Sequence, residues 1–204
     1  MGVYSVKQYL ETGSKVQFLE LLDNGITPRG CEHIAKALHP KNHTEIEVLK
    51  LDHNQFGWEG MVYLAEGLAV NPTLRLLSLT YCGIDMNGAD YLFQILIYSR
   101  SALEEVYLSG NNLCNEGVIT VLKGASIAKS LKKLALADNQ FNEDDKVLST
   151  MEVCMRKNKK LSKYDFKFNT FTDEGKCFSN QTHRGSSGGH LPIKFELTFL
   201  YKHT

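Results

Sequence analysis

Residues 49–56 have the sequence LKLDHNQF, and this stretch decides the fold because five others share its frame. Each follows the pattern L-x-L-x-x-N-x-L, with apolar residues at the first, third and last positions. The Asn-type position recurs at spacings of 30, 28, 29, 28 and 30 residues. A fixed period of this length indicates a repeat architecture. The other stretches are LELLDNGI (19–26), LSLTYCGI (77–84), VYLSGNNL (106–113), LALADNQF (134–141) and YDFKFNTF (164–171).

The segments between these stretches have an apolar period of about 3.6 residues instead of 2, which predicts helices. The clearest lie at 59–71, 87–99 and 115–128. We expect Asn87 and Asn115 to cap two of them, because Asn favours the position before a helix. Each unit is therefore predicted to be a strand, a turn and a helix. One such unit cannot bury its own apolar face, whereas stacked units can.

This pattern resembles the leucine-rich repeat family, specifically its ribonuclease-inhibitor-like subclass, whose units have about this length and carry a full helix. The resemblance covers residues 16 to about 178. It implies an α/β solenoid, a horseshoe arc of about six units, with a parallel sheet on the concave face and helices on the convex face. It also implies a ladder of Asn side chains bonded to the turns. Cys82 replaces Asn in one unit, where its thiol can donate weakly, so we expect no reactive cysteine there.

The two ends are predicted to close the stack, because a terminal strand otherwise exposes unpaired backbone groups. We expect residues 1–15 to form an N-terminal cap helix and residues 16–178 to form the repeats. Residues 179–190 are rich in Gly and Ser and predict a flexible loop. Residues 191–204 alternate apolar and polar side chains, which predicts a C-terminal capping strand beside residues 163–168. We expect a monomer; in the alternative, this strand pairs with another chain and makes a dimer.

Composition excludes several classes of function. Lys and Arg total 23 and Asp and Glu total 23, so the chain lacks the overall positive charge of a nucleic-acid-binding protein. No stretch reaches the roughly 20 apolar residues of a membrane helix, and the first residues lack the apolar run of a signal peptide. We therefore expect no membrane association and a cytoplasmic location. A cytoskeletal or ciliary location is one form of this expectation. The cysteine spacing and the absence of nucleotide-binding motifs predict neither metal nor cofactor.

Strand residues that do not enter the core are expected to face the concave wall, where this fold recognises proteins. His53, Tyr81 and Tyr107 lie in neighbouring strands about 5 Å apart and can form one aromatic patch. Trp58, the only Trp, is expected at the rim, with the alternative that it covers its own helix. We predict no catalytic residue. The predicted protein-binding residues are Lys50, Asp52, His53, Trp58, Tyr81, Glu105 and Tyr107.

The leading hypothesis is a non-enzymatic protein-protein interaction module or scaffold that binds another protein through its concave face. The rival hypothesis is a GTPase-activating regulator, because the repeats also resemble the Ran GTPase-activating proteins, which use a loop Arg near the first repeats. Arg29 is the only candidate by position. That family has more repeats and an acidic C-terminal segment, whereas residues 151–204 carry an excess of Lys and Arg. A third hypothesis, an inhibitor of a ribonuclease, fits the fold, but the chain lacks the long acidic horseshoe that grips a basic enzyme.

Overall fold

The chain alternates strands and helices along its length. The computed structural model describes residues 2–13, 15–171 and 196–198. The strands are β1 (Phe18–Glu20), β2 (Val48–Lys50), β3 (Leu76–Ser78), β4 (Glu105–Tyr107), β5 (Lys133–Ala135), β6 (Lys163–Asp165) and β7 (Glu196–Thr198). The helices are α1 (Gly2–Leu10), α2 (Pro28–Leu38), α3 (Gly57–Leu68), α4 (Met86–Ile97), α5 (Cys114–Ile127) and α6 (Asp145–Lys157), with a 3-10 turn η1 (Pro40–Asn42). The predicted strand-turn-helix unit is confirmed.

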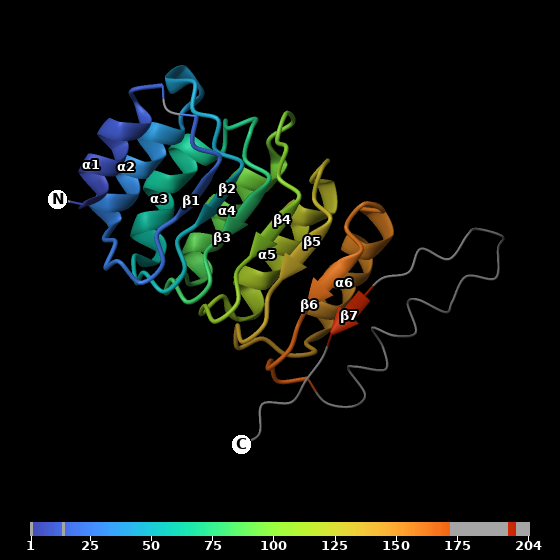
Figure 1. Ribbon diagram of the computed structural model, residues 1–204. Helices are drawn as coiled ribbons and strands as arrows, with labels where there is room; N and C mark the ends of the chain where they lie inside the picture. Colours follow the sequence, from blue (N-terminus) through green and yellow to red (C-terminus); the bar gives the residue numbers. More distant parts are fainter. Residues whose placement is uncertain (1, 14, 172–195, 199–204) are drawn as a thin grey trace.

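All the described strands belong to one parallel sheet, in the order β1-β2-β3-β4-β5-β6-β7. Figure 1 shows them side by side as one layer and helices α2 to α6 as a second layer behind them, with α1 next to α2 at one end. Each crossover from one strand to the next in β1 to β6 therefore passes through a helix on the same face. This is the predicted α/β solenoid, with the sheet on its concave face and the helices on its convex face.

The leucines of the repeat frame form the core between these two layers. Leu49 and Leu77 are opposite each other in β2 and β3, and both are fully buried. Leu64 of α3 and Leu92 of α4 belong to the same buried cluster. Fully burying a Leu side chain contributes about 1.5–3 kcal/mol. Because every unit supplies the same positions, the core is one continuous column that no unit could build alone.

The helices begin one or two residues before the ranges that periodicity predicts, and the two predicted helix caps are wrong. The cap of α4 is Asp85, whose carboxylate accepts a hydrogen bond from the Asn87 N–H at 2.9 Å. Helix α5 follows Leu113 without any side-chain cap. Asn115 lies inside the first turn, where its side-chain oxygen accepts from the Asn142 N–H of the next unit at 3.0 Å. The earlier helix starts move both predicted caps into the helix.

Buried Asn side chains connect each turn to the preceding one. The Asn111 amide donates to the carbonyl oxygens of Leu79 and Leu108, each at 2.8 Å. Its oxygen accepts from the backbone N–H groups of Cys82 at 3.1 Å and Ile84 at 3.0 Å. One side chain therefore satisfies four backbone groups in two units. Equivalent positions are held by Asn54, Asn139 and Asn169.

Cys82 occupies the ladder position of its unit and uses its thiol as a donor. Its Sγ atom lies 3.3 Å from the Leu51 carbonyl oxygen. Burial raises the pKa of the Cys82 thiol to about 12, so the group remains protonated at neutral pH. A protonated, buried thiol suits a structural donor and does not suit a nucleophile.

Both ends of the stack carry an added element. Leu10 of α1 is buried in the core cluster beside the first repeat. Strand β7 pairs in parallel with β6, with Leu197 opposite Tyr164. Most of the predicted loop and capping segment lies outside the described residues, in 172–195 and 199–204. The capping roles of 1–15 and 191–204, and the loop at 179–190, therefore remain proposals.

The ladder predicts a large effect for one buried amide. We expect Asn111→Ala to lower the free energy of unfolding by about 3 kcal/mol or more, because each buried backbone group left without a partner costs about 1–3 kcal/mol. The matched control is Asn112→Ala at the adjacent exposed position, where the side chain accepts one bond from Gln140 at 2.7 Å. Urea denaturation should place this control within about 0.5 kcal/mol of the wild type. Equal losses in both variants would contradict the ladder.

The pairing of β7 with β6 predicts that the C-terminal segment stabilises the stack. A chain that ends at Gly189 should unfold at a lower urea concentration, because it leaves the outer edge of β6 unpaired. A control chain that ends at Tyr201 retains β7 and should match the full chain. An unchanged midpoint for the shorter chain would refute the cap. A concentration-dependent dimer that this truncation abolishes would instead favour strand exchange between chains.

Candidate functional site

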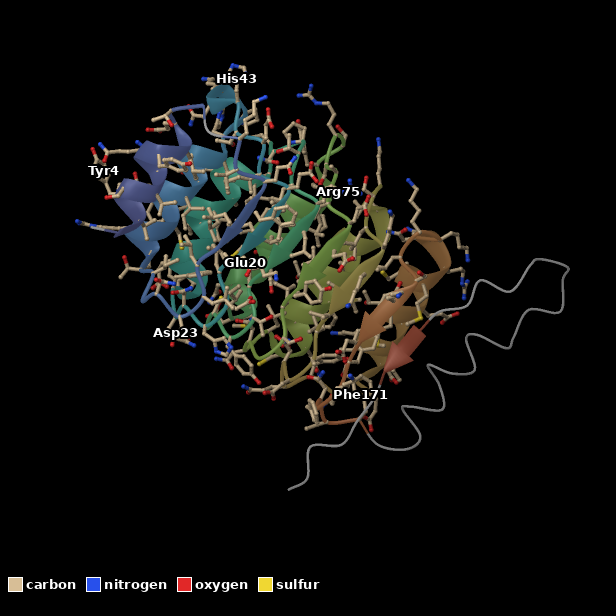
Figure 2. The ribbon with its side chains drawn as sticks, viewed as in Figure 1. Tyr4, Glu20, Asp23, His43, Arg75 and Phe171 are labelled. Carbon is tan, nitrogen blue, oxygen red and sulfur yellow. The ribbon has the colours of Figure 1, made fainter. Side chains whose placement is uncertain are left out.

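The concave face is the sheet surface that the helices do not cover, and it carries the side chains that alternate with the buried leucines. Figure 2 shows Glu20 of β1 between two edges of the sheet, with Arg75, which precedes β3, at one edge and Asp23, which follows β1, at the other. The strand register aligns equivalent positions of successive units. The row nearest the strand ends consists of Glu20, Lys50, Ser78, Tyr107, Ala135 and Asp165.

A second row follows the strands, and its backbone is strained. Three residues after the end of each strand from β1 to β6, the backbone adopts the left-handed conformation. This conformation costs a residue other than Gly about 1–2 kcal/mol. Strain that recurs along one edge is a reason to look for function there. The row consists of Asp23, His53, Tyr81, Gly110, Asp138 and Phe168, with φ values of 51°, 60°, 54°, 68°, 51° and 58°.

Two aromatic side chains of this second row are stacked. The rings of His53 and Tyr81 have centroids 5.1 Å apart and planes inclined by 20°. Tyr81 is 42% exposed although it is held on both sides. A Cβ at Gly110 would overlap the Tyr81 ring, so the ring lies against the backbone of the next turn. The sequence predicts that His53 and Tyr81 are neighbours, but it does not reveal the supporting role of Gly110.

Tyr107 forms a polar group with the strand residues beside it. Its hydroxyl donates to the Glu105 carboxylate, and the Lys133 ammonium lies 4.6 Å from its ring centroid. Partial burial, and then the bond to Glu105, raise the pKa of Tyr107, so the hydroxyl is neutral at physiological pH. Lys133 is absent from the predicted set. Its position opposite Glu105 in the register, one unit further along, is the signal that could have identified it.

Lys50 and Asp52 lie on the same face, but both have partners. The Lys50 ammonium forms an ion pair with Glu20 at 2.7 Å. The Asp52 carboxylate accepts from the Ser78 hydroxyl at 2.6 Å and from the Thr80 N–H at 2.7 Å. Asp52 therefore connects the end of β2 to the end of β3. Its contacts describe a structural role, whereas Lys50 can exchange its exposed partner for one on a ligand.

Trp58 is separate from the other predicted residues. It lies in the first turn of α3 and is 40% exposed. The other residues that line its groove come from α4. The structure therefore places six predicted residues on the strands or the turns that follow them, and Trp58 at the start of a helix in the outer layer.

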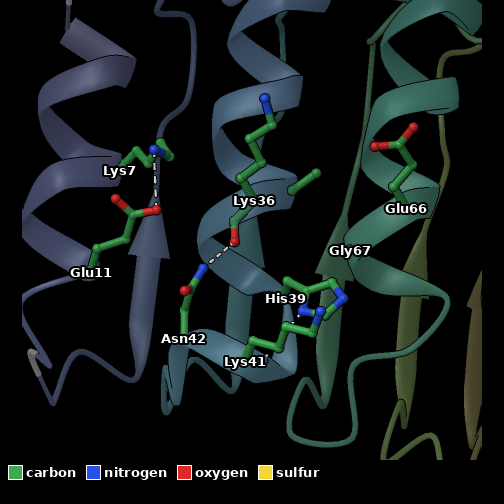
Figure 3. Close-up of a pocket in the computed structure, with 9 residues that line it drawn as sticks. Lys7, Glu11, Lys36, His39, Lys41, Asn42, Glu66 and Gly67 are labelled. Carbon is green, nitrogen blue, oxygen red and sulfur yellow. Dashed lines mark hydrogen bonds and ion pairs between the residues drawn. The ribbon is translucent and has the colours of Figure 1, made fainter.

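A further groove crosses α1, α2 and α3, and Figure 3 shows it in close-up. Two of its charged side chains pair with each other, and Lys36 pairs with Glu32 of the same helix. Lys7 and Glu11 form an ion pair at 3.1 Å, and the Asn42 amide donates to the Lys36 carbonyl oxygen. The His39 ring accepts from a backbone N–H at 3.3 Å. These contacts join η1 to α2, which indicates a structural junction.

Arg29 lies elsewhere, in the first turn of α2. Its side chain is exposed and borders a cavity that also contains Val6 of α1, Ile26 and His33. Apolar side chains and the Tyr4 ring, 5.4 Å from that of His33, make up much of this cavity. Arg29 therefore lies on a different element from the aromatic residues of the concave face and is distant from them in the sequence.

Within the described ranges, no three His, Cys, Asp or Glu side chains gather in a way that could hold a metal ion. No helix in the same ranges is long and apolar enough to cross a membrane.

Known proteins match this chain through its repeats. The family model described as "Leucine Rich repeat" matches residues 70–93. The human NACHT, LRR and PYD domains-containing protein 13 is 32% identical over 118 residues, which cover 58% of this chain and 10% of that protein. Mouse ribonuclease inhibitor is 32% identical over 126 residues, which cover 60% of this chain and 27% of the inhibitor. The chain therefore spans a small part of the length of these relatives.

Solved structures share the fold at low identity. "Leiomodin-1 Actin-Binding Site 2 (ABS2)" superposes with a TM-score of 0.59 at 14% identity, covering 74% of this chain and 84% of that one. The tropomodulin C-terminal domain of Caenorhabditis elegans has a TM-score of 0.57 at 13% identity, covering 89% and 91%. The repeat frame, the parallel sheet with its outer helices, and these matches lead to one conclusion. The chain is built of leucine-rich repeats that are similar to those of ribonuclease inhibitor.

Proposed function

We propose that this chain is a non-enzymatic protein-interaction module, and that its partner binds the concave aromatic cluster of His53, Tyr81 and Tyr107. The observation that carries the proposal is the stack of His53 on Tyr81. Both residues are exposed on left-handed backbone at the end of a strand. Held aromatic rings suit binding, because they offer contact area with little loss of side-chain entropy when a partner arrives.

The charged residues around the cluster would orient the bound partner. Lys50 lies in the same row as Tyr107, Glu105 lies in the adjacent row, and Lys133 lies over the Tyr107 ring. Both signs of charge are present and already have partners, so they contribute more to orientation than to affinity. The partner that fits is a protein surface with an apolar protrusion and polar groups around it, which need not be strongly charged.

The similar proteins support a protein as the ligand. One relative is a ribonuclease inhibitor, and one solved structure with this fold is an actin-binding site of leiomodin-1. We therefore propose a scaffold in the cytoplasm, with cytoskeletal proteins as the first partners to test. A pull-down from cell extract with mass spectrometry would identify the partner used in the titrations below.

The GTPase-activating alternative depends on Arg29. Under that hypothesis, the chain would accelerate single-turnover GTP hydrolysis by a small GTPase, and Arg29→Ala would abolish the acceleration. Under the scaffold hypothesis, neither the wild-type chain nor the Arg29→Ala variant would change the rate of GTP hydrolysis. The two hypotheses differ in this one measurement, which can be made before the binding partner is identified.

The concave cluster predicts where substitutions weaken the partner. Tyr81→Ala and Tyr107→Ala should each weaken binding by about 2 kcal/mol or more, because interface energy is concentrated in a few desolvated aromatic residues. Lys146→Ala, at an exposed position of α6, should change binding by less than about 0.5 kcal/mol. Titration of the three variants against the recovered partner provides the measurement.

Thermal unfolding of the same variants separates binding from packing. Tyr81→Ala should keep a melting temperature close to that of the wild type, because its ring is exposed and its backbone does not depend on it. A clear fall in melting temperature would mean that the ring packs instead of binding. Equal losses of binding in all three variants would move the partner to another face.

A further inference from the structure

The outer helical layer contains a groove that the proposed function does not use. Trp58 of α3 lines it on one side, and α4 supplies the other lining residues: Asn87, Asp90, Tyr91 and Gln94. We call it the α3–α4 groove. It lies between two helices, whereas the concave aromatic cluster lies on the strands and the turns that follow them.

The repeat pattern explains why a groove occurs between these two helices. Gly67 of α3 lies against the backbone of α2, where an added Cβ would overlap the Ala35 carbonyl oxygen. An added Cβ at Gly124 of α5 would lie 3.2 Å from the Phe93 side chain and 3.3 Å from the Leu96 side chain of α4, which is a tight contact. The equivalent position of α4 is Ile95, 28 residues after Gly67 and 29 before Gly124, which are the spacings of the Asn-type positions there. Because the distance between helices depends on the side chains at their contact, Ile95 favours a wider separation between α3 and α4.

The groove has the chemistry of a site for a cation. Its rings belong to Trp58 and Tyr91, and Trp offers the best face for a cationic group. Asp90 is exposed, and no other residue in the described ranges forms a salt bridge or hydrogen bond with its carboxylate. The amide oxygens of Asn87 and Gln94 are further acceptors. A cation over the rings would also have a carboxylate and amides to receive its hydrogen bonds.

The two helices also have one sign of charge. Their sequences contain Glu59, Glu66 and Asp90 and no Lys, Arg or His. Glu66 faces the groove of Figure 3, where its charge acts on Lys36 of α2. Of these three carboxylates, Asp90 lines the α3–α4 groove. In a chain with no net charge, this local excess favours a positively charged ligand.

We propose that the α3–α4 groove binds an arginine side chain of a partner protein, with the guanidinium group on the Trp58 ring and paired with Asp90. Arginine fits better than lysine for two reasons. Its planar group stacks on aromatic faces, and its fixed set of N–H donors matches a carboxylate together with amide oxygens. The chain would then have two separate binding surfaces, one on each layer.

Trp58 allows a direct test, because it is the only Trp in the chain and its fluorescence therefore reports on this groove alone. The probe is an acetylated and amidated peptide, Gly-Arg-Gly-Arg-Gly, titrated into the full chain. The control peptide has citrulline in place of arginine, which keeps the shape and removes the charge. We expect a saturable change in Trp58 fluorescence with the arginine peptide, and at least about fivefold weaker binding of the citrulline peptide.

Matched variants separate a specific contact from general attraction. Asp90→Asn should weaken the arginine peptide by about fivefold or more, whereas Glu66→Gln, which removes the same charge from the neighbouring groove, should stay within about twofold. Tyr81→Ala should also leave this titration unchanged, because it alters only the concave face. Circular dichroism of each variant checks its folding. Equal binding of both peptides, equal losses in Asp90→Asn and Glu66→Gln, or no saturable change up to about 10 mM peptide would overturn the proposal.

Discussion

The structure depends on one interaction: the bond network that a buried Asn makes between two consecutive turns. The Asn54 side-chain oxygen accepts from the N–H groups of Asn24 and Ile26, each at 2.9 Å, while its amide donates to Leu21 and Leu51. A strand of three residues cannot hold such a turn by itself, because a short parallel pair makes few bonds. Each turn is therefore completed by the unit that follows it. This dependence makes the repeats stack in fixed register and sets the left-handed residue that precedes each ladder position.

The hydrogen bonds of the ladder alternate from one unit to the next, and the capping of the helices alternates in the same way. Cys82 has no oxygen to offer, and the Asn139 side-chain oxygen has no partner among the described residues. In the turns that precede these two positions, the N–H groups of Gly57 and Cys114 donate instead to the backbone oxygens of Cys82 and Asn139. The helices that begin there, α3 and α5, have no side-chain cap, and they are the same helices that carry Gly67 and Gly124. The missing caps and the two helix glycines therefore recur together with a period of two units, and the α3–α4 groove lies between α3, which has no such cap, and α4, which has one.

The sequence predicted the strands of this structure better than the ends of its helices. The leucine frame identified β1 to β6 and the parallel sheet, because burial of a fixed pattern leaves one stacking arrangement. The ends of the helices were less accessible. The predicted helix 59–71 stops at Leu68 because Asn71 is recruited elsewhere, its amide donating to Leu38 at 2.8 Å and its oxygen accepting from Leu74. At the site, the sequence predicted which aromatic residues are neighbours. The support from Gly110 depends on turn geometry, which a linear pattern does not contain.

The left-handed row links this geometry to function. Since the ladder and the strand register fix the backbone at these turns, the fold does not require a large side chain there, and Gly110 shows the relaxed choice. His53 and Tyr81 each cost about 1–2 kcal/mol at such a position. Their stacking returns only about 0.5–1.5 kcal/mol for the pair. Stacking alone does not offset this cost, which is a reason to look for a binding role for the pair. The strained backbone lies on the concave edge, where the two stacked rings are exposed.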